Sequence, residues 1–250
     1  MFQNEKWPGT NYDAIEQFAQ PKPFWQQNLD MRGRAGNTSF FASGNAIDQG
    51  GAIQFLDGFQ RQSARLNVDH ARGDWTFGLN TYFARDKKDG FDQEDGGGAF
   101  FRLTRAPPIA NLEQRDSRGR LFIRPNLQGG GSQNYNPLYY LENQRNLTNT
   151  NRFIGGALAQ WHPVNWADLY FNFSYDGANV VAQLFRDKGF RGTTGPEATL
   201  NRGFLRKQTE QQQQYNASSN LVLRKTMFGD LNTRATFRYL YEDANYDYRR

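Results

Sequence analysis

The stretch that decides the fold is ARLNVDHARGDWTFGLNTYFARD, residues 64–86. Apolar and polar residues alternate on both sides of the central RGD at 72–74. A period of two residues is typical of a β-strand with one apolar face and one polar face. Gly73 and Asp74 have the chemistry of a tight turn. The stretch therefore predicts two long antiparallel strands joined by a short turn.

The two faces of these strands differ in chemistry. On the first strand, residues 59–71, the apolar face carries Ala64, Leu66 and Val68. Its polar face carries Arg61, Ser63, Arg65, Asn67 and Asp69. On the second strand, residues 75–85, we expect an apolar face of Trp75, Phe77, Leu79 and Phe83. We expect its other face to carry Thr76, Gly78, Asn80, Tyr82 and Arg85.

Six further segments alternate in a similar way, so the sequence predicts eight strands. The other six are 24–33, 38–48, 152–161, 167–176, 213–227 and 231–248. The connections between the eight are alternately short (RAGN, RGD, PVN and FGD) and long. An up-and-down antiparallel sheet places alternate connections at opposite ends, so this pattern predicts one trimmed end and one elaborated end. We expect residues 1–23 to form a leading loop, and 24–250 to form part of a β-barrel.

The composition is unusual for a protein with a conventional core. Hydrophobic residues make up 37%, aromatic residues 15%, and the mean hydropathy is −0.85. No run reaches the roughly 20 apolar residues of a membrane helix, but a spanning β-strand needs only about 10 alternating ones. Short turns at one end and long loops at the other are typical of bacterial outer-membrane barrels. We therefore expect the apolar face to meet lipid, with Trp75, Trp161 and Trp166 at the membrane interface beside the short turns.

On this hypothesis the polar face lines a wet lumen. The strand residues that we expect to face the lumen or a ligand are Arg61, Arg65, Asn67, Asn80, Tyr82, Asp168, Asn172 and Arg238. In the long connection, Tyr135, Tyr139 and Tyr140 could stack on sugar rings or contact a partner, or they could pack within the loop.

The sequence offers little for catalysis. It has no cysteine, and its two histidines, His70 and His162, each lie beside a short turn without an assembled triad. An acidic cluster of Asp89, Asp92, Glu94 and Asp95 is a weak candidate for calcium, because its spacing does not match the twelve-residue calcium loop. The net charge of +5 comes without a block of like charges, so we expect no nucleic-acid partner. We predict a protein that is not an enzyme and has no cofactor.

Several motifs resemble a known family. QQNLDMRG supplies Asn28, Leu29 and Gly33; the next strand and its exit supply Phe40, Ser43, Gln49 and Gly50; and FQRQSARLNVD supplies Arg61, Ser63, Arg65, Asn67 and Asp69. In this order they resemble a block of the SusC/RagA-like TonB-linked outer-membrane receptors, and NPLYYLEN with Arg152 and Gly156 downstream does so too. The resemblance covers most of residues 9–180. It departs at Phe40, where tyrosine is usual, and at Tyr12, where tryptophan is usual.

The resemblance implies a nutrient importer. Receptors of this family have a plug and a barrel of 22 strands, take up oligosaccharides or peptides, and work with a SusD-like surface lipoprotein and with TonB. The sequence shows neither plug nor signal peptide, so we expect a fragment with about a third of such a barrel, in contact with outer-membrane lipid. Two alternatives stay open: a small passive barrel of the porin or adhesin kind, and a soluble β-rich carbohydrate-binding module.

Overall fold

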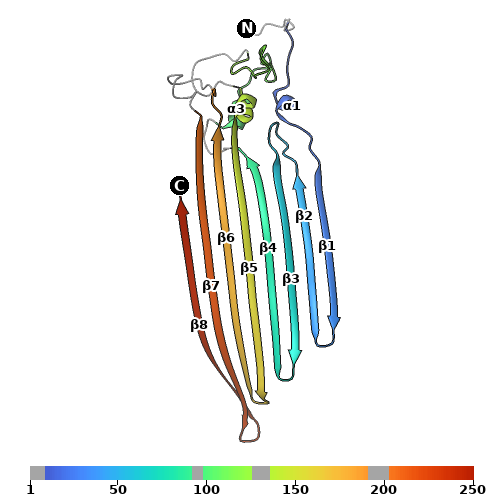
Figure 1. The fold of residues 1–250 in the computed structure, drawn as a ribbon, viewed down its shortest axis with the longest axis vertical. Coiled ribbons are helices and arrows are strands. Elements are labelled where there is room, and N and C mark those ends of the chain that lie inside the picture. Colours follow the sequence, from blue (N-terminus) through green and yellow to red (C-terminus); the bar gives the residue numbers. More distant parts are fainter. Residues whose placement is uncertain (1–8, 92–97, 126–135, 191–202) are drawn as a thin grey trace.

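The chain forms one large antiparallel sheet (Figure 1). The computed structural model describes residues 9–91, 98–125, 136–190 and 203–250. The eight strands are β1 (Phe24–Ala35), β2 (Thr38–Gln49), β3 (Gly58–Arg72), β4 (Trp75–Gly90), β5 (Gln144–Val164), β6 (Ala167–Arg186), β7 (Phe204–Met227) and β8 (Leu231–Arg249). Each strand pairs with the next along the chain, and within the described residues β1 and β8 do not pair, so the sheet is open. The predicted all-β, up-and-down architecture is confirmed.

Tight turns close the sheet at one end. Gly36 (φ 58°) follows β1 and Gly73 (φ 57°) follows β3, and in each two-residue turn only this first residue has a positive φ. That pattern is typical of a type II′ hairpin, which places glycine first. The turn between β7 and β8 has two residues with positive φ, Phe228 (51°) and Gly229 (85°). The short turns therefore lie where the sequence predicts them.

Besides β4, which ends at Gly90 rather than at 85, three strands extend further toward the loops than the alternation predicts. β5 begins at Gln144 rather than at 152, β6 ends at Arg186 rather than at 176, and β7 begins at Phe204 rather than at 213. The added segment of β5, QRNLTNTN, is largely polar on both faces, whereas that of β6, GANVVAQLFR, is largely apolar but lacks a period of two. Side-chain alternation therefore stops before the backbone ladder does, because ladder hydrogen bonds require no particular side chain.

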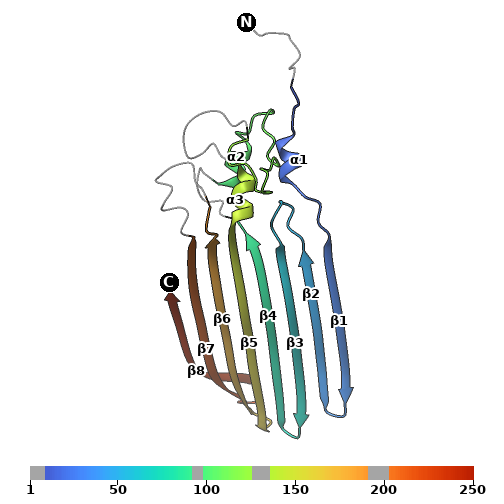
Figure 2. The ribbon, with the colours of Figure 1, turned by 45° about the horizontal axis from the view of Figure 1, so that its top comes forward.

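The loops at the other end pack into a small core of their own (Figure 2). It includes the three short helices α1 (Ala14–Phe18), α2 (Ala99–Leu103) and α3 (Pro137–Asn143). Its buried residues are Phe18, Leu56, Ala99, Ala110, Leu112, Leu121, Leu138, Tyr139, Leu141 and Phe190. These residues come from the leading segment and from all three long connections, so the loop end is a folded unit. No helix in the described parts of the chain is long and apolar enough to cross a membrane.

Asn136 holds the centre of this loop core. Its side-chain oxygen accepts the backbone N–H of Leu138 at 3.0 Å and so caps α3. Its side-chain nitrogen donates to the carbonyls of Leu112 (2.7 Å) and Phe122 (3.0 Å). Asn136 is fully buried. One amide therefore fixes a helix and two separate loop segments.

Candidate functional site: the two faces of the sheet

The strand register brings five of the predicted lumen residues together. Arg65 pairs with Tyr82, and Asn67 pairs with Asn80, across β3 and β4. The guanidinium of Arg65 lies over the ring of Tyr82 at 5.6 Å. Arg61 lies on the same side of β3, four residues closer to the loops. Residues directly opposite one another share a face of the sheet, so these five side chains form one patch.

Of the other three predicted strand residues, Asp168 lies near the short turns, and Asn172 and Arg238 lie elsewhere on this side. Asn172 of β6 donates its amide to the hydroxyl of Ser218 at 3.4 Å. Arg238 of β8 lies opposite Asn220. They share the polar face with the Arg65 patch but are separated from it by intervening strands.

Two ion pairs cross neighbouring strands on the polar face. The guanidinium of Arg61 donates to both carboxylate oxygens of Asp86, at 2.7 and 2.8 Å. Arg152 of β5 donates to Asp176 of β6, at 3.0 and 2.5 Å. Asp86, Arg152 and Asp176 were not among the predicted lumen residues. The available signal was the alternation itself, because even-numbered residues of these strands lie on the face opposite to Phe83, Phe153 and Tyr175. Among the described residues Arg65 has no ion pair, so it is the uncompensated cation of its patch.

One sequence assignment was wrong. Arg85 was expected on the polar face with Tyr82, but it pairs with Gln62 and therefore lies on the same side as Phe83. The physical reason is the pleat: side chains alternate, so Arg85 cannot share a face with residue 82 without a bulge.

A buried carboxylate lies at the short-turn end of the polar face. Asp168 is 5% exposed and contacts His162 and Arg224. The His162 Nδ1 lies 2.6 Å from an Asp168 oxygen. The ring of His162 also meets the edge of Tyr170 at 6.4 Å. His70 lies on the apolar side of the sheet, with its Nδ1 2.8 Å from the hydroxyl of Thr38. The two histidines are thus on opposite faces, and each is engaged in a cross-strand contact.

The loop tyrosines are used in packing. Tyr139 is 7% exposed and stacks on Phe190 at 5.5 Å. Tyr140 meets the edge of Phe190 at 6.1 Å, lies under the guanidinium of Arg102 at 4.8 Å and accepts a hydrogen bond from Gln144 at 2.5 Å. Tyr135 lies outside the described residues.

The structure describes only one member of the acidic cluster. Asp89 is 7% exposed, and one of its oxygens accepts the backbone N–H of Asp57 at 3.0 Å. Asp92, Glu94 and Asp95 lie outside the described residues. Within the described parts of the chain, no three His, Cys, Asp or Glu side chains are grouped so that they could hold a metal ion.

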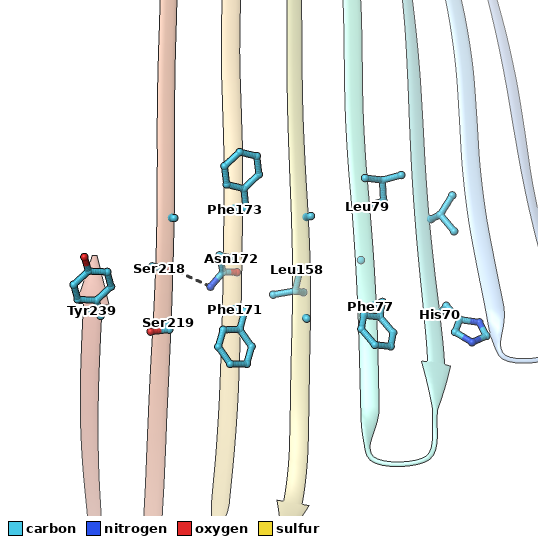
Figure 3. Close-up of a pocket in the computed structure, with 15 residues that line it drawn as sticks. His70, Phe77, Leu79, Leu158, Phe171, Asn172, Phe173, Ser218, Ser219 and Tyr239 are labelled. Carbon is cyan, nitrogen blue, oxygen red and sulfur yellow. Dashed lines mark hydrogen bonds between the residues drawn. The ribbon is translucent and has the colours of Figure 1, made fainter. Parts of the chain in front are cut away.

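The opposite face of the sheet is apolar and corrugated (Figure 3). Large side chains project from β4, β6 and β8, as with Phe77, Phe173 and Tyr239. Small ones lie between them on β5 and β7, where Ala157, Ala159, Ala217 and Ser219 occur in the same rows. A shallow groove follows these small residues. Many of the large side chains are 40–50% exposed, for example Phe77 (44%) and Phe173 (49%).

Aromatic rings border this apolar band on two sides. Near the short turns, Trp75 stacks on Trp161 at 5.2 Å. Toward the loops, Tyr175 contacts Phe153 at 6.1 Å and Tyr215 at 4.9 Å. Phe153 and Trp161 lie on one strand, eight residues apart, which corresponds to about 26 Å along the strand.

Above the band, the same side of the sheet becomes polar. One row of paired residues crosses all eight strands: Gln27, Ala46, Gln62, Arg85, Asn151, Asn179, Gln211 and Asp247. All but Ala46 are polar or charged. The apolar band therefore ends at a defined height, while the strands continue toward the loops.

Comparisons with known proteins support the fold. No protein-family model and no curated protein matches the sequence. Among solved structures, the fold is similar to a chain of the RagAB peptide transporter, with a TM-score of 0.72 and 18% identity over 94% of this chain and 26% of that chain. It is also similar to the RagAB peptide importer in its closed-closed state (TM-score 0.69, 16% identity, 95% of this chain and 31% of that one). For the open-open state of this importer the TM-score is 0.68 and the identity 17%, over 95% of this chain and 31% of that one. The chain thus spans about a quarter to a third of these transporter chains.

Proposed function

We propose that this chain is part of the wall of a TonB-dependent outer-membrane importer that takes up peptides. The observation that carries the proposal is the two-sided sheet: an apolar band bordered by aromatic rings on one side, and a polar, partly charged surface on the other. The structural similarity to RagAB transporter chains supports it.

The apolar band has the dimensions of a membrane. Strands of outer-membrane barrels tilt by about 35–45°, so about 26 Å along β5 corresponds to about 20 Å across the bilayer between ring centres. The rings themselves extend this height toward the apolar band of about 25 Å that such barrels present to lipid. An aromatic row at each border is the arrangement of membrane girdles. The short turns would then face the periplasm, and the packed loops the outside.

A continuous water-exposed apolar band is unfavourable in a soluble protein. Contiguous apolar patches of more than a few hundred Å² are rare on soluble monomers. In this chain, exposed apolar side chains extend across the whole sheet, from Met31 (59% exposed) on β1 to Tyr241 (52% exposed) on β8. Lipid contact accounts for this surface, which a soluble carbohydrate-binding module would have to cover with a second layer.

The polar face suits a peptide better than a neutral sugar. Arg65 is a cation without a carboxylate partner among the described residues, and it lies beside Tyr82, Asn67 and Asn80. A guanidinium binds carboxylates in a forked geometry, and side-chain amides both donate and accept hydrogen bonds, as peptide groups require. We propose that this patch contacts the carboxylates and backbone of peptides in the lumen. We also propose that a surface lipoprotein covers the folded loop end.

Cysteine labelling of the full-length protein in intact cells tests the membrane placement. The sequence described has no native cysteine, so this segment adds no background to single substitutions. We expect Asn80→Cys on the polar face to react with a water-soluble maleimide, and Leu79→Cys, the adjacent residue on the apolar band, to stay unlabelled. A lipid-attached nitroxide should quench a fluorophore only at residue 79. Equal labelling of both positions would exclude the membrane-spanning arrangement.

Uptake measurements test the substrate. We expect Arg65→Ala to reduce uptake of a labelled acidic peptide severalfold, and Arg34→Ala, a cation on the same face at the short-turn end, to have little effect. Unchanged peptide uptake in the Arg65 variant would remove the patch from the transport pathway. Uptake that does not depend on TonB would favour the passive barrel.

A further inference from the structure

A small polar hollow lies on the outward side of the sheet, immediately above the apolar band. Its volume is about 250 Å³. The outward-facing residues that line it are Trp25 of β1, Ala46 and Asp48 of β2, Gln60 and Gln62 of β3, and Arg85 and Lys87 of β4. The register places them in two adjacent rows, Trp25–Asp48–Gln60–Lys87 and Ala46–Gln62–Arg85. Four strands thus contribute to one recess on the side that would face lipid.

The hollow carries more positive than negative charge. Arg85 and Lys87 are both exposed, and the residues that the structure describes offer neither of them an ion pair. Asp48 is the one acidic group of the lining, and its carboxylate already accepts a hydrogen bond from Gln60 at 3.1 Å. The neighbouring Arg61–Asp86 pair is on the other side of the sheet. Lys87 also lies near the buried carboxylate of Asp89, the next residue on the same side of β4, but forms no ion pair with it among the described residues, so both cations can contact an external anion.

A trough with a polar upper rim (Gln27 and Gln62) and an apolar lower part continues from this hollow toward the membrane interior. It has a volume of about 850 Å³ and shares Ala46 and Gln62 with the hollow. Its floor is made by Gly44, Ala46 and Ala64, and Leu29 and Phe83 form its walls. Nothing lies within 4 Å of the place that a Cβ of Gly44 would occupy. The floor of the trough is therefore open. The trough is as wide as the two strands β2 and β3, which separate Leu29 from Phe83.

We propose that the hollow and the trough together bind one phosphate-bearing lipid of the outer leaflet. Arg85 and Lys87 hold the phosphate, Gln60 and Gln62 donate to its oxygens or to the neighbouring headgroup, and the acyl chain lies in the trough below. A forked guanidinium together with an ammonium suits a phosphate, which accepts hydrogen bonds on three oxygens. The proposal rests on the membrane orientation given under the proposed function, but not on the identity of the transported substrate.

Lipid retention by the full-length protein tests this site. We would reconstitute it into nanodiscs of phosphatidylcholine that contain a few per cent phosphatidic acid, and count the retained phosphatidic acid by native mass spectrometry. Each basic side chain near an anionic membrane surface contributes enough that loss of two weakens binding by about 30-fold. We expect the Arg85→Gln/Lys87→Gln double variant to lose the retained lipid accordingly.

A matched double variant serves as control. Arg145→Gln/Lys207→Gln removes the same charge from the same side and the same end of the sheet, but outside the hollow. We expect it to retain phosphatidic acid as the parent does. Equal losses in the two double variants, or no loss in either, would overturn the proposal.

Two further outcomes separate the possible failures. If inorganic phosphate at millimolar concentration displaces the bound lipid completely, the hollow binds free phosphate and the lipid assignment is wrong. If cysteine labelling shows that the parent protein does not enter the bilayer, the proposed function itself fails, and this inference fails with it. Membrane insertion without selective retention would overturn only the lipid site.

Discussion

An arginine in place of Ala157 is the sharpest perturbation of the two-sided sheet. Ala157 lies on the apolar side of β5, opposite Leu79 and Phe173. It is four residues from Phe153 and four from Trp161, or about 13 Å along the strand from each aromatic row. In a membrane this position is the midplane, where arginine on the lipid face of a barrel costs about 2–4 kcal/mol, against about 0–1 kcal/mol near the interfaces. We expect Ala157→Arg to lower the free energy of unfolding by about 2–4 kcal/mol.

Two controls on the same strand isolate the cause. Leu158→Arg places the charge on the polar face one residue away, and Asn151→Arg places it in the polar row above the band. We expect each to cost less than about 1 kcal/mol. Unfolding of the full-length protein by urea in phosphatidylcholine vesicles, followed by tryptophan fluorescence, gives all three values. Equal costs at positions 157 and 158, or a cost below about 1 kcal/mol at 157, would refute the lipid-facing assignment, because a water-exposed face tolerates arginine.

Three further predictions concern the ion pairs and the loop end. A double-mutant cycle on Arg61 and Asp86, whose side chains are 40% and 21% exposed, should give a coupling of about 0.5–1 kcal/mol, reduced by salt; a coupling near zero would make the pair incidental. Leu138→Ala, at a fully buried position of the loop core, should cost about 2–4 kcal/mol locally, seen as rapid proteolysis of the loops while the sheet stays intact; unchanged proteolysis would contradict the packed loop end. Hydrogen bonds from the Arg120 side chain and backbone hold the pKa of Asp116 below its ordinary value. Its contribution to the turn is therefore present above pH about 4 and lost as the pH falls through the lowered pKa. The protection factor of the Arg120 amide, which is the exchange rate relative to the intrinsic rate at the same pH, should therefore fall in acid, and the Asp116→Asn variant should lack this pH dependence.

Part of the polar patch follows from the sequence by counting. Once the RGD turn pairs Arg72 with Trp75, each step away from the turn pairs the next residues, and seven steps bring Arg65 opposite Tyr82. The same counting places Arg85 opposite Gln62, on the apolar side. Hairpins joined by two-residue turns are local, so their registers can be read from the turn. This explains why the patch of β3 and β4 could be predicted, and why the position of Arg85 could have been.

Contacts across the long connections could not be predicted in this way. The stack of Trp75 on Trp161 joins β4 to β5 across residues 91–143, and no turn geometry fixes that register. The Arg152–Asp176 pair crosses a short turn, but the register shift between Trp161 and Val164 prevents counting from that turn. The loop core has the same difficulty: Phe18, Leu112 and Leu138 are far apart in sequence and follow neither a period of two nor one of 3.6. Such contacts are set by packing in three dimensions, which an alternation pattern does not encode.

The turn between β5 and β6 shows that burial, and not the turn, decides the register. Val164 pairs with Ala167, and a regular ladder from there would place Gln160 opposite Phe171. That register would move the apolar side of β6, and of every strand beyond it, to the polar face of the sheet. Instead the ladder shifts between Trp161 and Val164, so that Ala159 faces Phe171 and Trp161 faces Leu169. A bulge costs one unpaired residue locally, whereas a slipped register would place the whole apolar side of three strands in the wrong medium. The irregularity at this turn is therefore what keeps the apolar band continuous from β5 to β8.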